Sequence, residues 1–316
     1  MCTMAVHSVD DVTELSSGLL TSPPAATARR TGVPTTVIHG MPGTGKSATI
    51  CSVLRAVSKR GCRVLVTALT NCAVDNILAR LVVEDASIRC VRVRKPADTP
   101  AVLTMAGSSC MFVGPGASED EPSTVDALRE LLRSASVIGA TTTSCVYPST
   151  HAYVACGGPY DLCIVDEAAQ LTLPGLVPAL GMSKSICLVG DDEQLPPMVR
   201  SPLALSAGMG RSLFAELRHG PRFPPSPTPI ESLGSLDPSI GIDAGRKSGL
   251  HGVSSSGASA VDGEAWSSGQ QHSQVFGLCK QYRMCLPIQW LSNQVTYNDQ
   301  LVAGSDAVAS QSLLQL

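Results

Sequence analysis

Gly40-Met41-Pro42-Gly43-Thr44-Gly45-Lys46-Ser47 is the stretch that decides the fold of this 316-residue chain. It fits the pattern G-x-x-x-x-G-K-[ST], in which backbone amides surround a polyphosphate at the start of a helix. The β-branched residues 33–39 before it predict a buried strand, and the apolar spacing of residues 48–58 after it predicts a helix. Strand, loop and helix in this order are the context that the motif requires. We therefore predict that this loop binds a nucleoside triphosphate.

Two residues of the loop have specific tasks. Lys46 reaches the outer phosphates, where it is a candidate catalytic residue, and the Ser47 hydroxyl ligates Mg²⁺. One alternative is an ordinary glycine turn, which does not explain the flanking strand and helix. The other is a dinucleotide-binding loop, which needs a third glycine where Ala48 stands. A nucleoside triphosphate and Mg²⁺ are therefore the predicted ligands, and the family resemblance given below specifies ATP.

Composition limits the classes of protein that this chain can be. Hydrophobic residues make up 44% of it, enough for a core, and the formal net charge is -3. Any nucleic-acid contact must therefore be local and made largely by backbone amides and hydroxyls. The 12 cysteines include no C-x-x-C pair, which indicates free thiols in a reducing compartment. No signal peptide is recognisable, and no apolar run reaches the roughly 18 to 20 residues that span a bilayer.

Apolar strands alternate with helical segments along much of the chain, and this order predicts an α/β fold with a parallel sheet flanked by helices. Besides the strand and helix around the loop, the expected strands are 63–68, 88–93, 136–140, 160–165, 185–190 and 275–279. The expected helices are 73–82, 125–132 and an amphipathic segment from Ile288 to Val295.

Changes in composition predict the domain boundaries. Residues 1–32 form a disordered leader, and residues 33–219 form the ATPase domain, with an insertion at 94–122. Residues 220–272 are first Pro-rich and then Ser/Gly-rich, too poor in apolar side chains to offset the entropy of ordering, so we expect a disordered low-complexity insert. Residues 273–316 supply the last strand and a hinge helix.

A phosphate loop needs carboxylates before it can hydrolyse ATP, and Asp166-Glu167 supplies two. They follow an apolar strand, which places them at its carboxyl end, where ligands of open α/β sheets gather. We expect Asp166 to hold Mg²⁺ and Glu167 to activate the attacking water. The alternative is an acidic pair that only caps a strand.

Two further motifs contain candidate residues. Gln194, after another strand end, can donate and accept hydrogen bonds and so could sense the terminal phosphate, unless it belongs to an ordinary Asp/Pro turn. Arg283 offers a planar fork for phosphate oxygens, and Tyr282 a ring on which a base can stack. Alone, a Tyr-Arg pair would be surface or core packing.

Six motifs together resemble the first RecA-like motor domain of superfamily 1 helicases, in the group that includes the nonsense-mediated-decay RNA helicases. They are Gly-Met-Pro-Gly-Thr-Gly-Lys-Ser (40–47), Ala-Leu-Thr-Asn-Cys-Ala-Val-Asp-Asn (68–76), Gly-Ala-Thr-Thr-Thr (139–143), Ile-Val-Asp-Glu-Ala-Ala-Gln (164–170), Gly-Asp-Asp-Glu-Gln-Leu-Pro-Pro (190–197) and Gln-Tyr-Arg-Met (281–284). Within the group the chain most resembles the eukaryotic DNA replication ATP-dependent helicase/nucleases, through residues 208–214, 292–297 and 304–306.

The resemblance implies a P-loop NTPase fold with a RecA-like sheet and adds roles at matching positions. It implies that Tyr282 packs on the adenine, that Arg283 touches the γ-phosphate, and that Thr70-Asn71 and Thr141-Thr142 contact the backbone of single-stranded nucleic acid. Small hydroxyl and amide side chains can bind phosphates without sequence preference. The alternative for each of these four residues is a helix cap or a turn.

The chain also departs from the family pattern. Residues 1–32 lack the glutamine segment that reads adenine in these helicases, and the chain ends at Leu316, before a second RecA-like domain, its arginine finger and a nuclease domain. We therefore expect a fragment or a truncated gene model.

The function that the resemblance implies is an ATP-dependent DNA helicase in the nucleus. The alternatives are an RNA helicase of the same superfamily and a nucleotide-binding fragment that does not turn over.

Overall fold

The computed structural model describes residues 4–5, 33–94, 110–113, 125–219 and 274–311, which all belong to one compact unit. The predicted disordered segment at 220–272 and most of the predicted leader lie outside these residues. Within them, no helix is both long and apolar enough to cross a bilayer. The described cysteines form no disulfide, as predicted.

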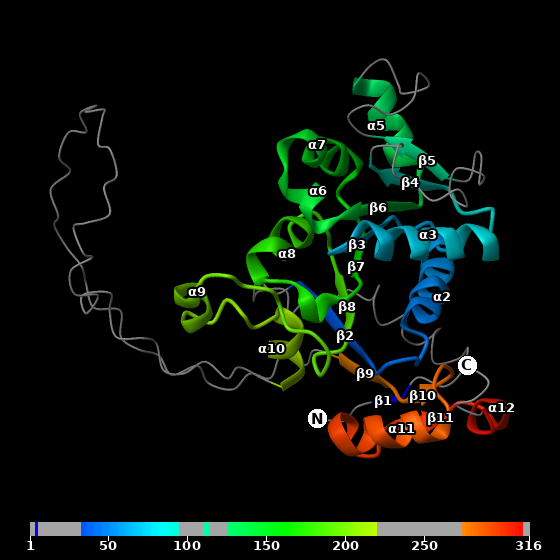
Figure 1. The fold of residues 1–316 in the computed structure, drawn as a ribbon. Coiled ribbons are helices and arrows are strands. Elements are labelled where there is room, and N and C mark those ends of the chain that lie inside the picture. Colours follow the sequence, from blue (N-terminus) through cyan, green and yellow to red (C-terminus); the bar gives the residue numbers. More distant parts are fainter. Residues whose placement is uncertain (1–3, 6–32, 95–109, 114–124, 220–273, 312–316) are drawn as a thin grey trace, which may run out of the picture. The chain divides into compact units, whose positions relative to one another are not determined.

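A nine-stranded sheet runs through the described residues, and all neighbouring strands in it are parallel (Figure 1). Its strand order confirms the predicted parallel α/β sheet. From one edge to the other the strands are β1 (Met4–Ala5), β9 (Gln274–Leu278), β2 (Thr35–Gly40), β8 (Ile186–Gly190), β7 (Leu162–Val165), β3 (Val64–Ala68), β6 (Val137–Thr141), β4 (Cys90–Val93) and β5 (Cys110–Val113).

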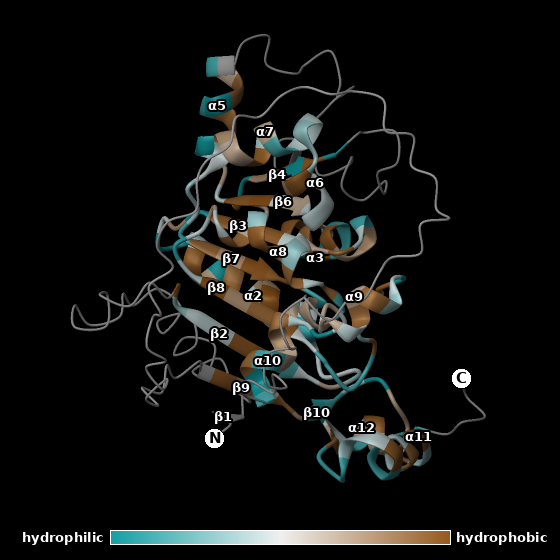
Figure 2. Cartoon of the chain, turned by 90° about the vertical axis from the view of Figure 1, so that its left-hand side faces the viewer, coloured by the Kyte–Doolittle hydropathy of each residue, from teal (hydrophilic) through white to brown (hydrophobic). Residues whose placement is uncertain are grey.

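Helices cover both faces of this sheet, because alternate side chains of each buried strand point to opposite faces. Val64 and Val66 of β3 pack with α2 (Lys46–Ser58) and α3 (Asn71–Glu84) in one core cluster. Leu65, between them, lies in a second cluster with side chains of the helices on the other face. The central strands are apolar along their length (Figure 2). The helices of the second face are α5 (Val125–Ser134), α7 (Pro148–Gly157), α8 (Leu173–Leu180) and α10 (Leu213–His219).

Short helical segments connect these elements. They are α6 (Thr142–Val146), the 3-10 helix η3 (Ala168–Gln170) and α9 (Pro202–Ser206).

Two segments predicted to lie outside the sheet contribute strands to it. Residues 94–122 were expected to be an insertion, but Cys110–Val113 forms β5, which pairs in parallel with β4 at the sheet edge. A four-residue strand between unpatterned flanks gives too short a periodic signal to recognise. Met4 and Ala5, from the predicted disordered leader, pair with Phe276 and Gly277 of β9 as β1.

The segment after β9 forms a small layer of its own. Its elements are β10 (Lys280–Gln281), α11 (Leu286–Ser292), the π-helical turn η5 (Asn293–Tyr297), β11 (Val302–Ala303) and α12 (Asp306–Ala309). β10 pairs with β11 in a separate two-stranded sheet.

The amphipathic helix predicted over Ile288–Val295 is present, but the face that it buries is not the expected one. Trp290 and Val295 are 64% and 75% exposed, whereas Gln289 and Asn293 are buried. Both buried amides donate to the Leu301 carbonyl oxygen, each at 3.0 Å. Hydrogen bonding to the returning chain, which apolar periodicity cannot detect, decides the orientation of this helix.

Candidate nucleotide and nucleic-acid site

The phosphate loop has the backbone geometry that its glycines predict. β2 ends at Gly40 and α2 begins at Lys46. Gly43 and Gly45 have φ angles of +74° and +85°, in the left-handed region that residues with a Cβ rarely adopt. A Cβ added at Gly40 would lie 2.4 Å from Lys46 Cγ, so the lysine stem packs directly on the loop.

Polar contacts within the loop fix the position of the Lys46 ammonium group. Lys46 Nζ donates to the Gly40 carbonyl oxygen at 2.8 Å. The Thr44 hydroxyl donates to the Met41 carbonyl oxygen at 2.7 Å and closes the turn. Lys46 and Ser47 are the first two residues of α2, so the positive end of the helix dipole lies beside the loop.

Asp166 and Glu167 directly follow β7, as predicted, and their environments differ. Asp166 is only 5% exposed, and burial, together with the negative charge of Glu167, raises its pKa to about 6, although the Lys46 charge opposes this shift. Glu167 adopts a left-handed φ of 52°, and its carboxylate accepts from Gln170 Nε2 at 3.2 Å. The buried carboxylate of Asp166, whose charge is only partly compensated, and the Ser47 hydroxyl in the first turn of α2 are hard oxygen donors of the kind that Mg²⁺ prefers, so the residues present fit this ion.

The loop after β8 centres on Asp191, a residue that sequence reasoning did not single out. Gln194 Nε2 donates to its Oδ2 at 2.6 Å, the Tyr297 hydroxyl donates to the same oxygen at 2.9 Å, and His39 Nε2 lies 3.2 Å from Oδ1. Burial alone would raise the pKa of Asp191, but these hydrogen bonds hold it below its ordinary value. Asp191 therefore joins the end of β2, the loop of Gln194 and the C-terminal layer.

The Gln281-Tyr282-Arg283 motif packs against the phosphate loop. The Tyr282 amide donates to the Gly43 carbonyl oxygen at 2.9 Å, and a Cβ added at Gly43 would lie 2.7 Å from Arg283 Cβ. The Tyr282 ring lies against Gly304, where an added Cβ would be 2.3 Å from Cε1, and yet Tyr282 remains 57% exposed. The main chain of Tyr282 and the side chain of Arg283 thus lie beside the loop, whereas the Tyr282 ring lies against Gly304.

The four predicted nucleic-acid contacts lie at the carboxyl ends of β3 and β6. Thr70 and Thr141 are N-cap residues of α3 and α6, and they accept from the Ala73 and Ser144 amides at 3.3 and 3.2 Å. The capping alternative is therefore correct for both threonines as a structural role. It does not exclude a second contact, because each hydroxyl oxygen has further hydrogen-bonding capacity.

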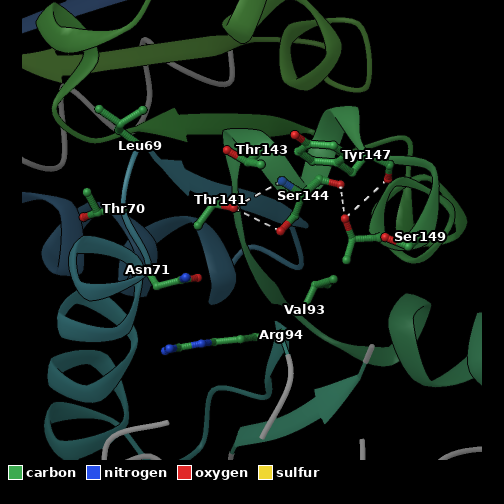
Figure 3. A pocket seen from close by; sticks show the side chains of 11 residues that line it. Leu69, Thr70, Asn71, Val93, Arg94, Thr141, Thr143, Ser144, Tyr147 and Ser149 are labelled. Atoms are coloured by element: carbon green, nitrogen blue, oxygen red, sulfur yellow. Dashed lines mark hydrogen bonds between the residues drawn. The ribbon is translucent and has the colours of Figure 1, made fainter. Parts of the chain in front are cut away.

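Two pockets open beside these residues. One has a volume of about 560 Å³, and its lining includes Thr70, Asn71, Thr141 and Arg94 (Figure 3). The other has a volume of about 360 Å³, and its lining includes Thr142. Thr70, Asn71 and Thr141 therefore share the larger pocket. Thr142, which is only 4% exposed, lines the smaller one.

A buried charge network behind the larger pocket was missed by sequence reasoning. Arg92, on β4, is fully buried, and its Nε donates to Asp75 Oδ1 at 2.6 Å while one terminal nitrogen donates to Asn71 Oδ1 at 2.8 Å. Arg94 also binds Asp75. Burial lowers the pKa of Arg92, although the hydrogen bond and the charge of Asp75 oppose the shift. An arginine within a buried strand, combined with an aspartate in the 68–76 motif, was the available signal.

The fold and the loop define the class of protein: a P-loop nucleoside triphosphatase with a parallel RecA-like sheet, in which the phosphate loop, the acidic pair and the loop of Gln194 follow β2, β7 and β8. The chain belongs to the AAA domain family, whose profile matches residues 22–111 and 117–202.

Relatives from animals and plants agree with the resemblance read from the motifs. The chain is 30% identical over 276 residues to the DNA replication ATP-dependent helicase/nuclease DNA2 of Homo sapiens, an alignment that covers 87% of this chain and 20% of that protein. It is 29% identical over 279 residues to the DNA replication ATP-dependent helicase/nuclease JHS1 of Arabidopsis thaliana, covering 88% of this chain and 16% of that protein. The chain thus spans about a fifth of the length of the curated relatives it matches. A solved structure of arterivirus nonstructural protein 10 (helicase) with DNA matches 57% of this chain and 35% of its own, at 14% identity and a TM-score of 0.31.

Proposed function

We propose that this chain is the motor domain of an ATP-dependent DNA helicase, in which ATP hydrolysis drives movement along single-stranded DNA. The observation that carries the proposal is the joint position of two sites. The phosphate loop follows β2, the hydroxyl-lined pocket follows β3 and β6, and all of these parallel strands end at the same edge of one sheet. The helicase names of the relatives support the same function.

At the nucleotide, the loop amides and Lys46 hold the β- and γ-phosphates, and Tyr282 offers its exposed ring to the adenine. Ser47 and Asp166 would hold Mg²⁺. When bound, this ion neutralises charge that develops on the phosphate oxygens. Arg283, whose Cβ lies next to Gly43, is in position to reach the γ-phosphate.

For hydrolysis, Glu167 is the proposed base. It takes a proton from the attacking water while that water adds to the γ-phosphorus and the bond to the β–γ bridging oxygen breaks. Gln194 lies in the loop after β8, the strand next to β7, and its Nε2 donates to Asp191 in this structure. We propose that Gln194 exchanges this contact for the γ-phosphate and so reports the nucleotide state to Tyr297 through Asp191.

At the nucleic acid, Thr70, Asn71 and Thr141 are proposed to bind phosphates of the strand through the larger pocket, with Thr142 at its border. The N-terminus of α3 opens into this pocket and favours negative charge. Arg94 is the single cationic side chain among the described residues that line it. These contacts read the backbone rather than the base sequence, as a translocating motor requires.

The chain spans about a fifth of the length of the helicase/nucleases that it matches, and we propose that it belongs to a longer protein of this kind. We propose that it carries a second RecA-like domain and a nuclease domain and that it acts in the nucleus, during DNA replication and repair.

Equilibrium binding and ATPase assays test the proposal. Residues 1–316 should bind a fluorescent ATP analogue with Mg²⁺, and they should bind oligo(dT). ATP turnover should rise when oligo(dT) is added. An equal or larger rise with oligo(U) would identify an RNA motor instead, and the absence of ATP binding would contradict the assignment of the nucleotide site.

A further inference from the structure

Tyr147 is an exposed aromatic side chain that has no role in the nucleotide site or in the phosphate contacts described above. It is 60% exposed, and it lines both the larger and the smaller pocket. Among the described residues that line the two pockets, it is the one aromatic side chain. Its ring lies across the larger pocket from Asn71 and Arg94 (Figure 3).

The backbone of Tyr147 is held from two directions because the residue joins two helices. It ends α6, where its amide donates to the Thr143 carbonyl oxygen at 3.0 Å. It also begins α7 as the N-cap residue, where its carbonyl oxygen accepts from the amides of His151 at 2.7 Å and Thr150 at 3.0 Å. The ring therefore projects from a fixed point, and little backbone order would be lost when a ligand packs on it.

The two pockets differ in chemistry on the two sides of this ring. Towards the larger pocket stand hydroxyl and amide side chains and Arg94, all groups that suit phosphates. The smaller pocket is also lined by threonines and by Gln170, but exposed apolar side chains contribute more to it, among them Val146 at 50% and Met198 at 86% exposure. Such a polar-to-apolar change matches a nucleotide, whose phosphate is charged and whose base has a flat apolar face.

We propose that Tyr147 is a stacking platform for one base of the single strand whose phosphates lie along the larger pocket. The proposal rests on the proposed function, since it needs a strand in that pocket. Because every base has a π-face, stacking on Tyr147 would add affinity without sequence preference. Nothing in the backbone bonds of this residue requires a tyrosine, because those bonds use only its main-chain amide and carbonyl.

Fluorescence anisotropy with residues 1–316 and labelled oligo(dT) tests this inference. Tyr147→Ala should weaken binding about 5- to 150-fold, the equivalent of about 1 to 3 kcal/mol for one stacked base. Tyr147→Phe, which keeps the ring, should bind as the unmodified chain does. Trp290→Ala is the matched control, since Trp290 is an equally exposed aromatic residue on α11, away from both pockets.

Modified oligonucleotides make the test independent of folding. The unmodified chain should bind an oligonucleotide of abasic sites more weakly than oligo(dT), by a factor close to that of Tyr147→Ala, and the variant should not distinguish the two ligands. A 2-aminopurine base should lose fluorescence on binding to the unmodified chain and to Tyr147→Phe, but not to Tyr147→Ala.

The outcomes separate this inference from the proposed function. If the unmodified chain binds oligo(dT) and Tyr147→Ala binds equally well, stacking on Tyr147 is wrong while the motor assignment stands. If the unmodified chain binds no single strand, both fail. Equal behaviour with oligo(U) would leave the platform in place and change only the kind of strand.

Discussion

Asp166 and Asp191 directly follow the neighbouring strands β7 and β8, yet their carboxyl groups have opposite pKa shifts. Both are buried, and the difference comes from their partners. Asp191 accepts hydrogen bonds from Gln194 and Tyr297 and contacts His39, whereas the charge of Glu167 lies next to Asp166. A buried carboxylate whose negative charge is not balanced by hydrogen bonds or positive charges destabilises the folded chain. Such destabilisation is characteristic of sites that bind a ligand.

Asp166→Asn should therefore stabilise the nucleotide-free chain at neutral pH. The pKa of Asp166 is about 6 in the folded chain and 3.8 in the unfolded chain. Its contribution to the free energy of unfolding is therefore fully present below pH 4 and is lost as the pH rises through 6. A shift of about two units corresponds to about 3 kcal/mol at most. Urea unfolding without nucleotide at pH 4.5 and 7.5 should show the gain of the variant mainly at pH 7.5. A gain of the same size at both pH values would contradict the assignment of the shift to Asp166.

Lys46→Ala and Glu167→Gln should separate binding from chemistry. Loss of the lysine removes a charge-assisted contact of about 1.5 to 3 kcal/mol to the phosphates, so the dissociation constant of Mg-ATP should rise at least tenfold. Glu167→Gln should leave ATP affinity nearly unchanged, because the proposed base acts on the water. Titration with a fluorescent ATP analogue measures both, and an equal loss of affinity in the two variants would refute the division of roles.

Arg92→Leu should destabilise the chain far more than removal of an exposed arginine. The guanidinium of Arg92 is fully buried on Asp75, and breaking such a pair costs about 3 to 5 kcal/mol. Arg94 remains to bind Asp75, which places the expected loss towards the lower end. Arg80→Leu is the control, because Arg80 pairs with Glu84 on an exposed helix surface, where such pairs contribute about 0.2 to 1 kcal/mol. Equal midpoints of urea unfolding for the two variants would show that the network is not structural.

At the scale of elements, the sequence predicts what local pattern controls. The strand before Gly40, the helix after it and the acidic pair at the end of β7 are where periodicity and motif place them. Pairing over long distances has no such local signal. β5 has four residues, and α11 turns Gln289 rather than Trp290 inward because the chain returns beside it at Leu301. The contacts of Asp191 with His39 and Tyr297 likewise join residues from distant parts of the chain.

Tyr297→Phe tests the connection between two elements, the loop after β8 and the π-helical turn η5. The variant keeps the ring, which is 7% exposed, and removes only the hydrogen bond to Asp191. Compared with the unmodified chain, the variant should lose about 1.5 to 3 kcal/mol of unfolding free energy. Its amide exchange should accelerate more in residues 293–301 than in β2. Tyr147→Phe is the control, since that residue is exposed. Unchanged exchange in residues 293–301 would mean that Asp191 does not hold this turn.

At the scale of the whole molecule, affinity for nucleic acid has to arise without a basic field. The chain has a formal net charge of -3, and the larger pocket is lined mainly by hydroxyl, amide and apolar groups. Hydrogen bonds to phosphates and a stacked base depend little on ionic strength, whereas cation–phosphate contacts release counterions. This protein should therefore bind a single strand through contacts that salt screens only weakly.

The salt dependence of oligo(dT) binding measures this directly. For single strands, log K falls with log salt by about 0.7 for each phosphate neutralised. With Arg94, itself paired with Asp75, and at most one further cation at the strand, we expect a slope between about -0.7 and -1.4. Affinity should then fall only about 3- to 7-fold between 50 and 200 mM salt. Arg94→Gln should reduce the slope by about 0.7, whereas Arg80→Gln, on the exposed face of α3, should leave it unchanged. A slope steeper than about -3 would require at least four phosphate contacts to cations, more than the larger pocket provides, and would move the binding surface away from Thr70 and Thr141.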